Sequence, residues 1–526
     1  MTELLPWWRR ALQAMASPPA PRLQAPRFGQ PMRGRRYESA AGGRVAAGWA
    51  TSSAGPNSEV DAARATLRDR SRDLARNSAL ANRALTVLAS SLVGEGIRPS
   101  PNTGSDRVDR ILLDLWASLG LAIDVDGRHD VYGLQVLATR AWLESGEALM
   151  RRRWRRPDDG LPVPMQIQLL EPDLLVDTIW PSTATPQGAR VQYGVEFDAI
   201  GRRVAYQMFR QHPGEVMTGA SYSDSVMVPA SEVSHVYHVT RPGQIRGVPW
   251  LAQVMLDLRD LDDLEHAEIV RQKMQACLAM FRETPVVGER IGLGSDDDVE
   301  QDDDGAYIET LRPGMVVKLP PGEQVKFLSP QQFGGFVQAC THYQRLISVG
   351  AQVPYELLTG DLSQVNYSSI RAGDLEFRRL VGVLRRQVVI PHICAPAWRW
   401  VVEAATLSGQ VPALSSAQLA AALAPNWHPP RWVAIDREAE IKADVLEIQA
   451  GLRTHEQAAA ERGMDWGALV TRLAAEHDEA EALGLSLLGF TDLSPSQSAK
   501  MPAPTASAPA SSDDNVSDDS DDSAAA

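Results

Sequence analysis

A long run of apolar residues at helical spacing is the feature that most limits how this chain can fold. Apolar residues recur in steps of three or four at Leu251, Val254, Leu258, Leu261, Leu264, Ala267, Val270, Met274, Cys277 and Phe281. This spacing predicts one amphipathic helix. At a rise of 1.5 Å per residue, about 34 residues would extend over on the order of 50 Å, more than a compact domain usually takes from one helix. The small neighbouring segments offer too little cover for its apolar surface, so we expect association between chains to bury it.

Two further helices are expected downstream. The first has an apolar face formed by Phe336, Cys340, Tyr343 and Ile347. We expect this helix to end at Gly350, and a polar loop at 359–368 follows it. Another helix begins near Ser369, and Pro391 and Pro396 lie within its register. Because proline removes a hydrogen bond and clashes with the preceding turn, this last helix is predicted to be kinked or divided.

The rest of the folded body mixes both kinds of secondary structure. Residues 57–92 have a helical pattern with charges between the leucines, which predicts one or two helices. Short alternating runs within 146–245 predict strands, and a smaller β segment is expected at 285–330. Near the end of the body, Thr454 and Gln457 form a capping box that is typical of short helices. We therefore expect an α+β protein.

Composition excludes several functional classes. The chain has 52 Lys and Arg against 66 Asp and Glu, so its formal net charge is -14. A field of that sign repels polyanions, which argues against general coating of nucleic acid. No apolar run approaches about 18 residues, so no membrane partner is expected. The cysteines, Cys277, Cys340 and Cys394, are far apart, which indicates a reducing compartment and neither a disulfide framework nor a thiolate zinc site.

Both ends of the chain have the composition of solvated segments. Residues 1–55 are rich in Pro, Gly, Ala and Arg, and we expect a basic arm that is largely disordered. Its first residues have the wrong charge order for a secretory signal. Residues 491–526 pass from Ser, Pro and Ala into a series of aspartates at Asp513, Asp514, Asp518, Asp519, Asp521 and Asp522. Such a tail is expected to be disordered as well.

Motifs for catalysis are weak. The phosphate-binding pattern G-x-x-x-x-G-K-[ST] does not occur, so the chain does not encode a motor of that class. His235 and His238 are three residues apart in an expected strand, which sends them to opposite faces and favours structural roles over metal ligation. We predict no catalytic residue, no cofactor and no metal site, and therefore no enzyme.

Two charged runs are open to more than one interpretation. An acidic run comprises Asp296, Asp297, Asp298, Glu300, Asp302, Asp303 and Asp304. It approximates half of a calcium-binding loop, but Leu311 takes the place of the bidentate glutamate, so a solvated loop is favoured. A basic run around Trp154 comprises Arg151, Arg152, Arg153, Arg155 and Arg156. Contact with phosphate is possible there, but salt bridges to acids of other subunits would satisfy these side chains equally well.

Six short motifs, in a fixed order, resemble those of the lambda-type portal proteins of tailed bacteriophages. They are Arg70–Asn77, Val93–Ile97, Ser145–Glu147, Gly194–Glu196, Arg241–Trp250 and Asn366–Arg371. The two most specific are RPGQxRGVPW at Arg241–Trp250 and NYSSxR at Asn366–Arg371. The order matches over roughly residues 35–470, and a later group also resembles the family: Trp432, Asp436, Glu440 and Gly451–Thr454. The long acidic run and the Asp/Ser tail depart from it.

The resemblance implies a portal fold with a β-rich wing, long stem helices, a small β clip and a helical crown. Its parts would be the arm at 1–55, the wing at 56–245, the first stem helix at 246–284, the clip at 285–330, the second stem helix at 331–352, the tunnel-loop region at 353–369, a proline-kinked helix at 370–408, the crown at 409–490 and the acidic tail at 491–526.

The resemblance also implies a function without catalysis. Such proteins form a ring, usually of twelve subunits, at one capsid vertex, through which a separate terminase packages double-stranded DNA and from which DNA leaves into the tail. The implied partners are other copies of the chain, the terminase large subunit, head-tail adaptors, the major capsid and scaffold proteins, and DNA without regard to sequence. The implied location is the virion, and the host cytoplasm during assembly.

Two sets of site residues follow from this resemblance. The tunnel loop would present Asp361, Ser363, Gln364, Asn366, Tyr367, Ser368 and Arg371 to the channel. The clip would contact terminase or adaptors through Asp296, Asp297, Asp298, Asp302, Asp303 and Asp304. Two alternatives stay open: another capsid-associated structural protein, such as a minor head protein or adaptor, and a metal-dependent nuclease or protease built on the histidines and the acidic run.

Overall fold

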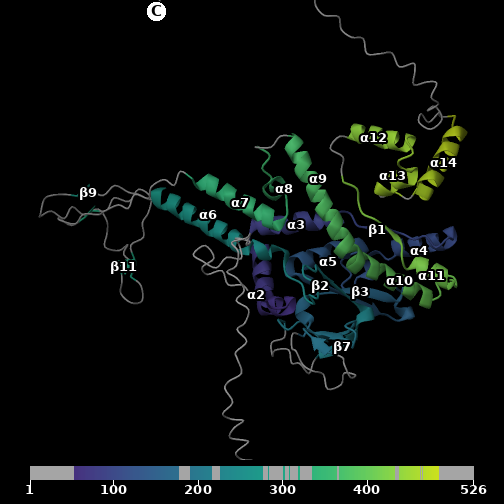
Figure 1. The fold of residues 1–526 in the computed structure, drawn as a ribbon, viewed down its shortest axis with the longest axis horizontal. Coiled ribbons are helices and arrows are strands. Elements are labelled where there is room, and N and C mark those ends of the chain that lie inside the picture. Colours follow the sequence, from purple (N-terminus) through teal and green to yellow (C-terminus); the bar gives the residue numbers. More distant parts are fainter. Residues whose placement is uncertain are drawn as a thin grey trace, which may run out of the picture. The chain divides into compact units, whose positions relative to one another are not determined.

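The computed structural model describes residues 53–176, 190–215, 225–276, 335–363, 367–432, 437–462, 464 and 466–484, with four short strands between 282 and 319. Contacts divide the chain into two units, Met1–Gly55 and Pro56–Ala526. The second unit contains helices and small sheets (Figure 1), which confirms the predicted α+β class. The predicted arm, apart from residues 53–55, and the predicted acidic tail lie outside the described residues.

Four helices open the second unit, namely α2 (Pro56–Asn77), α3 (Ala79–Val93), α4 (Asp106–Ser118) and α5 (Val131–Ser145), with a short 3-10 turn, η3 (Gly120–Ile123), before α5. The first two confirm the helices predicted at 57–92. Asp130 begins α5 because its side chain accepts a hydrogen bond from Gly133 N, which satisfies a free amide of the first turn. Most of α3 is buried, and it packs against α5 in the centre of the main core.

Two antiparallel sheets follow. The first has the order β3-β2-β8 and contains β2 (Glu147–Trp154), β3 (Met165–Leu170) and β8 (Val233–Tyr237). The second has the order β4-β5-β6-β7 and contains β4 (Arg190–Gln192), β5 (Val195–Phe197), β6 (Arg203–Phe209) and β7 (Ser225–Pro229). Three short 3-10 turns connect them: η4 (Pro157–Asp159), η5 (Pro172–Leu174) and η7 (Ala230–Glu232). The predicted β-rich region is confirmed, and the second sheet has a small core of its own.

The first predicted stem helix is shorter than its apolar periodicity indicates. It begins with a 3-10 turn, η8 (Trp250–Gln253), and continues as α6 (Met255–Ala276). The expectation of a helix through residue 283 is wrong, because Arg282–Glu283 forms strand β9. Pro285 lies two residues further on, and proline disfavours helical geometry in the residue before it, here Thr284.

The second predicted stem helix is α7 (Phe336–Ala351), which lies beside α6 (Figure 1). Gly350 does not end it as expected, because the helix runs to Ala351 and Gln352 takes the left-handed conformation with φ 56°. A Cβ on Gly350 would lie 2.3 Å from Val254 Cγ1. The glycine therefore permits close packing of α7 against the start of the other helix.

A single helical path follows the polar loop. It consists of α9 (Tyr367–Leu384), a π-helical segment η10 (Arg385–Cys394) and α10 (Ala395–Leu407). The helix was predicted to be kinked or divided at its prolines, and its α-helical geometry is indeed interrupted from Arg385 to Cys394. Pro391 lies in the π-helical segment, whose wider turn accommodates a residue without an amide donor, and Pro396 lies in the first turn of α10, where no donor is needed.

Helix α8 (Tyr355–Thr359), which was not predicted, precedes the polar loop. The last elements are mainly short helices, as predicted: α11 (Ser416–Ala422), β13 (Asn426–His428), α12 (Arg437–Gln449), α13 (His455–Glu461) and α14 (Trp466–Ala482). The capping box is confirmed, because Gln457 N donates to Thr454 Oγ1 and Thr454 N donates to Gln457 Oε1, both at 3.1 Å. Strand β13 pairs with β1 (Arg98–Ser100), so the later chain returns to the end of α3.

The small β segment between α6 and α7 is partly described. Strand β9 pairs in parallel with β12 (Lys318–Leu319), and β10 (Glu300–Gln301) pairs antiparallel with β11 (Tyr307–Ile308). The aspartates of the acidic run, 296–298 and 302–304, lie outside the described residues. Within the described part of the chain, none of the helices has the length and apolar character needed to span a membrane.

Candidate functional site

The helix pair α6/α7 exposes several apolar side chains that the described part of the chain does not cover. Leu258, Leu261 and Ile347 are buried and join the main core. The exposed apolar side chains of the pair are Leu256 (70% exposed), Ile269, Val270, Val337 (69%), Leu346 and Val349 (76%). Single exposed apolar residues are ordinary, but a set along one helix pair indicates a surface that another protein covers.

The exposed side of α6 is also acidic. Its charged residues are Asp257, Asp260, Asp262, Asp263, Glu265 and Glu268 against Arg259, Arg271 and Lys273. Arg259 and Asp263 approach only to 3.9 Å and are both exposed, so solvent weakens their attraction. Partial burial and the neighbouring Asp263 raise the pKa of Asp262. The helix thus presents a surplus of negative charge.

A groove of about 560 Å³ lies where α6, α7 and α8 meet. Its walls include the acids Glu265, Glu268 and Asp361 and the apolar side chains of Phe336 and Val337. Glu268 is bound by Arg271, whose Nε donates to Glu268 Oε2 at 2.7 Å. The groove therefore joins the acidic side of the helix pair to the first residue of the predicted tunnel loop.

The polar loop begins where Gly360 ends α8 with φ 75°. Asp361 Oδ1 accepts a hydrogen bond from Ser363 N at 2.9 Å, and this bond lowers the pKa of Asp361. Of the predicted loop residues, Gln364 and Asn366 lie outside the described residues, as do the side chains of Tyr367, Ser368 and Arg371 in the first turns of α9. The structure therefore tests the position of the loop's first half only.

A buried network lies beneath the helix pair, at the chain segment that leads into α6. Arg246 Nε donates to Glu147 Oε2 at 2.8 Å, and His235 Nε2 lies 2.5 Å from the same oxygen. His235 Nδ1 in turn lies 3.2 Å from Arg203 Nη1. These contacts require a neutral His235 ring with its proton on Nε2, since Nδ1 faces a donor.

The pKa values in this network follow from burial and charge together. Burial alone would raise the pKa of Glu147, but the Arg246 charge and the His235 hydrogen bond hold it well below its usual range. Burial lowers the pKa of His235 to about 4, against the opposing effect of Glu147. At neutral pH the network thus contains an ionised carboxylate, a charged guanidinium and a neutral imidazole.

Four of the six motifs that carried the resemblance meet at this network. Besides Glu147, Arg246 binds Tyr193 O beside Gly194, with Nη1 donating at 3.0 Å. Arg72 Nε donates to Ser145 Oγ at 3.1 Å, which connects the Arg70–Asn77 motif to the same place. A Cβ on Gly247 would lie 2.1 Å from Gly146 O, so only glycine permits this crossing. The sequence motifs therefore fix the direction in which the chain enters α6.

The arginine run in β2 has structural contacts within the chain. Arg152 is buried and pairs with Glu403 at 2.5 Å, with its guanidinium 4.5 Å from the ring of Trp154. Arg155 Nε donates to Gln166 Oε1 at 2.7 Å. The salt-bridge interpretation holds for Arg152, but its partner lies in the same chain rather than in another subunit.

Among the described residues, one group of side chains could offer three atoms to a metal ion: Glu171, Asp173 and His212. Arg72 already occupies this group, since its Nη2 lies 2.9 Å from Glu171 Oε2 and 2.7 Å from Asp173 Oδ2. Burial alone would lower the pKa of Arg72, but Asp173 raises it. The group is better described as an ion-pair cluster that ties α2 to η5.

Sequence reasoning missed two features of this region. It favoured a structural role for His235 but did not identify its partner, Glu147, which contacts it from the adjacent strand. It also assigned Gly350 to a helix end rather than to close packing. The S-G-E and R-G-V-P motifs were the available signals, because each places a charged residue beside a glycine, which permits close approach of two segments.

Comparison with known proteins gives a consistent result. Residues 42–385 match the model of the family described as phage portal protein, lambda family. A probable portal protein of Halomonas phage phiHAP-1 is 28% identical over 329 residues, which cover 60% of this chain and 61% of that protein. The portal protein of Escherichia phage N15 is 28% identical over 277 residues, 48% of this chain and 51% of that protein. Portal protein B of Escherichia phage lambda is 26% identical over 276 residues, with the same coverage.

The matches thus span 61% and 51% of the length of these curated relatives. Among solved structures, a chain from the neck of an empty GTA particle is 14% identical with a TM-score of 0.40, covering 76% of this chain and 93% of that one. A chain from the virion of a native gene transfer agent particle is also 14% identical, with a TM-score of 0.38 and the same coverage.

Proposed function

The chain belongs to the lambda family of phage portal proteins, and from this premise we propose that it forms a closed ring at one capsid vertex through which double-stranded DNA enters and leaves. The observation that supports this most is the set of exposed apolar side chains on the α6/α7 pair, with Val337 and Val349 largely exposed. Repeating one contact around an axis buries that surface in every copy and leaves no open end.

The charge of the helix pair fits passage of DNA rather than its retention. Duplex DNA carries about one charge per 1.7 Å of its axis, and each arginine contact to phosphate adds affinity. Helix α6 exposes Asp260 and Asp263, with an overall surplus of acids. A negatively charged channel wall makes few tight contacts with DNA phosphates, so a separate motor can move the duplex past it. We propose no catalytic group and no cofactor for this role.

We propose that the loop after α8 touches passing DNA without reading its sequence. Most of its side chains are small or polar, apart from Leu362, Val365 and Tyr367, and Asp361 is its charged residue between 359 and 368. An arginine clamp would grip phosphates, whereas this composition allows weak contact. Arg371, in the first turns of α9, could instead bond neighbouring carbonyls or acids and hold the base of the loop.

We further propose that the segment 285–330 is the clip, which contacts the terminase large subunit during packaging and head-tail adaptors afterwards. Contacts to major capsid and scaffold proteins would place the ring in the virion, after assembly in the host cytoplasm. Six aspartates of the clip, at 296–298 and 302–304, would speed encounter with basic partner surfaces. Replacing them by asparagine should weaken terminase binding at low salt and matter less at high salt; unchanged binding at low salt would reject this electrostatic role.

The experiment that tests the ring combines light scattering with class-averaged electron micrographs of the purified chain. The expected result is one closed ring with an axial hole and a mass that is an integer multiple of 57.4 kDa. A monomer at micromolar concentration would contradict the proposal. An assembly without an axial hole would favour a minor head protein or an adaptor, and metal-dependent cleavage of DNA or protein would favour an enzyme.

A further inference from the structure

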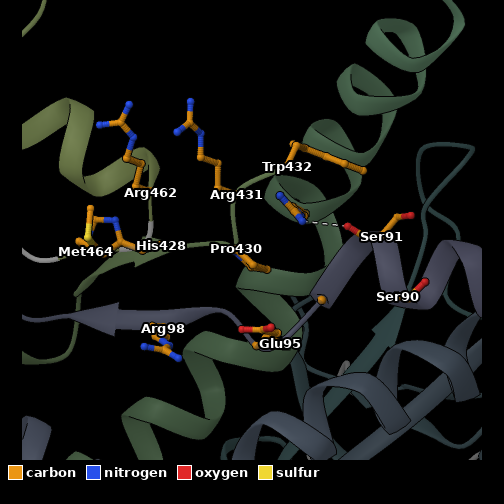
Figure 2. Close-up of a pocket in the computed structure, with 13 residues that line it drawn as sticks. Ser90, Ser91, Glu95, Arg98, His428, Pro430, Arg431, Trp432, Arg462 and Met464 are labelled. Carbon is orange, nitrogen blue, oxygen red and sulfur yellow. Dashed lines mark hydrogen bonds between the residues drawn. The ribbon is translucent and has the colours of Figure 1, made fainter. Parts of the chain in front are cut away.

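A pocket of about 540 Å³ lies away from the helix pair, where the end of α3 meets β1, the start of η10 and the segment after β13 (Figure 2). Four arginines line it, namely Arg98, Arg385, Arg431 and Arg462, together with His428. The one acid in its wall is Glu95. Cationic side chains from four elements that are distant in sequence thus surround one cavity.

Arg385 is a buried cation in this wall. It is 8% exposed, and its Nε and Nη2 donate to Leu92 O and Ser91 O, both at 2.8 Å. These acceptors are carbonyls at the end of α3, which carry partial rather than full negative charge. Burial lowers the pKa of Arg385 to about 10. A full negative charge in the pocket would compensate this guanidinium.

The arginines of the opposite wall share one carboxylate that lies behind the wall rather than in it. Asp444, on α12, accepts hydrogen bonds from Arg453 and Arg462 and lies 3.9 Å from Arg431. Figure 2 shows the side chains of Arg431 and Arg462 extending side by side. Arg98 stands opposite His428 in the β1/β13 pair. The wall therefore holds guanidinium groups in fixed positions, the arrangement that binds carboxylates or phosphates.

We propose that this pocket binds the acidic C-terminal tail of the same chain, through the aspartates between Asp513 and Asp522. The tail has six aspartates within ten residues, and its carboxylates match the fork geometry of arginine. A single extended peptide fits a cavity of this size, whereas duplex DNA is a stiff rod with a persistence length of about 50 nm. The inference does not depend on the proposed ring function.

The chain length between pocket and tail allows this contact. Met464 lines the pocket, and α14 begins at Trp466 and ends at Ala482. At 1.5 Å per residue, this helix carries the chain at most about 25 Å away. Residues 485–512 reach up to roughly 90 Å when fully extended. A tether of this kind holds its end near the pocket at an effective concentration of up to about millimolar.

Fluorescence anisotropy of a labelled peptide with the sequence of residues 508–526 tests the proposal on the full chain. The receptor is a variant whose six tail aspartates are asparagine, so that its own tail does not compete. The peptide should bind this receptor, and affinity should fall steeply with salt. Wild-type chain should bind the peptide about tenfold more weakly, because its own tail occupies the pocket.

Pocket variants locate the binding. R98Q and R98Q/R462Q in the same receptor should weaken peptide binding by about tenfold or more. Arg98 is exposed, so R98Q keeps the test valid if the double variant does not fold. The matched control is R107Q/R110Q, which removes two exposed arginines of α4 outside this pocket and should leave affinity unchanged.

Three results would overturn the proposal. They are equal peptide affinity in the pocket variants and the control, equal affinity of wild-type chain and receptor, and displacement of the peptide by a single-stranded oligonucleotide at a lower concentration than by unlabelled peptide. The last would assign the pocket to nucleic acid.

Discussion

Arg246 Nε donates to both carboxylate oxygens of Glu147, at 3.1 and 2.8 Å, and the two side chains are only 2% and 1% exposed. The pair lies between the first sheet and the segment that leads into α6. Either side chain alone would be a buried charge without a counter-ion. The pair therefore has to form for the segment leading into α6 to fold.

Glu147→Gln should therefore lower the free energy of unfolding by about 3–5 kcal/mol, since it leaves Arg246 buried without its counter-ion. Urea unfolding at one fixed protein concentration measures this, because an oligomer's stability depends on concentration. The matched control is Asp263→Asn in the exposed Arg259–Asp263 pair, with an expected change within about 0.5 kcal/mol. Equal effects of both variants would contradict the importance assigned to the buried pair.

Stability should fall as pH is lowered from 6.5 towards 4. His235 has a folded-state pKa of about 4 against an ordinary value of 6.5, so in this interval the unfolded chain binds a proton that the folded chain does not. The free energy of unfolding then decreases by up to about 1.4 kcal/mol per pH unit for this residue.

His235→Gln should reduce this slope but not remove it, because burial also lowers the pKa of His238 and His392. Glu147 adds to this loss of stability only below pH 4.5, the ordinary pKa of its carboxyl group. Urea midpoints between pH 4.5 and 7.5 give the slope, and an unchanged slope in the variant would show that His235 is not neutral in the folded chain.

Gly350→Ala should destabilise the chain by about 1–3 kcal/mol, because the new methyl group overlaps Val254 Cγ1. The matched control is Gly382→Ala in α9, where a Cβ meets nothing within 4 Å; this helix substitution should stabilise by up to about 1 kcal/mol. In the double variant with Val254→Ala the two costs should be less than additive, since the smaller side chain leaves room. Additive costs would mean that the helices do not pack as closely as described.

These variants also show how much was predictable from the sequence. The spacing of apolar residues located α6, α7 and the strands, because an element with one face in the core and one in solvent repeats its apolar residues regularly. It misplaced the end of α7, because that end depends on a neighbour: Gly350 faces Val254. It located the interruption at Pro391 but not its form, which is a π-helical turn. The Glu147–His235 contact joins residues 88 positions apart. Local pattern carries no information on such pairs, and the family motifs include Glu147 but not His235.

Val349→Asp should weaken ring assembly without unfolding the subunit. Val349 is 76% exposed on α7, so the folded monomer tolerates the charge, whereas an interface that buries it loses at least about 1.4 kcal/mol, or tenfold in affinity. Light scattering over a dilution series measures the shift. The control is Ile200→Asp, at an 89% exposed turn between β5 and β6, which should assemble normally. Normal rings with Val349→Asp would exclude this side of α7 from the interface.

The last prediction concerns the loop between α8 and α9, and three variants separate its length from its chemistry. Deleting residues 361–366 should leave ring assembly intact, because Gly360 ends α8 and α9 begins at Tyr367, but it should shorten the packaged DNA or impair its retention. Replacing the same residues by Gly and Ser should restore most of the packaged length, since the proposed contact needs a polar loop and no particular side chain. Asp361→Arg should slow packaging, because a cation would bind phosphates that now pass freely. Gel analysis of DNA from assembled particles measures all three, and full-length DNA packaged and retained by the deletion variant would remove any role of this loop in translocation.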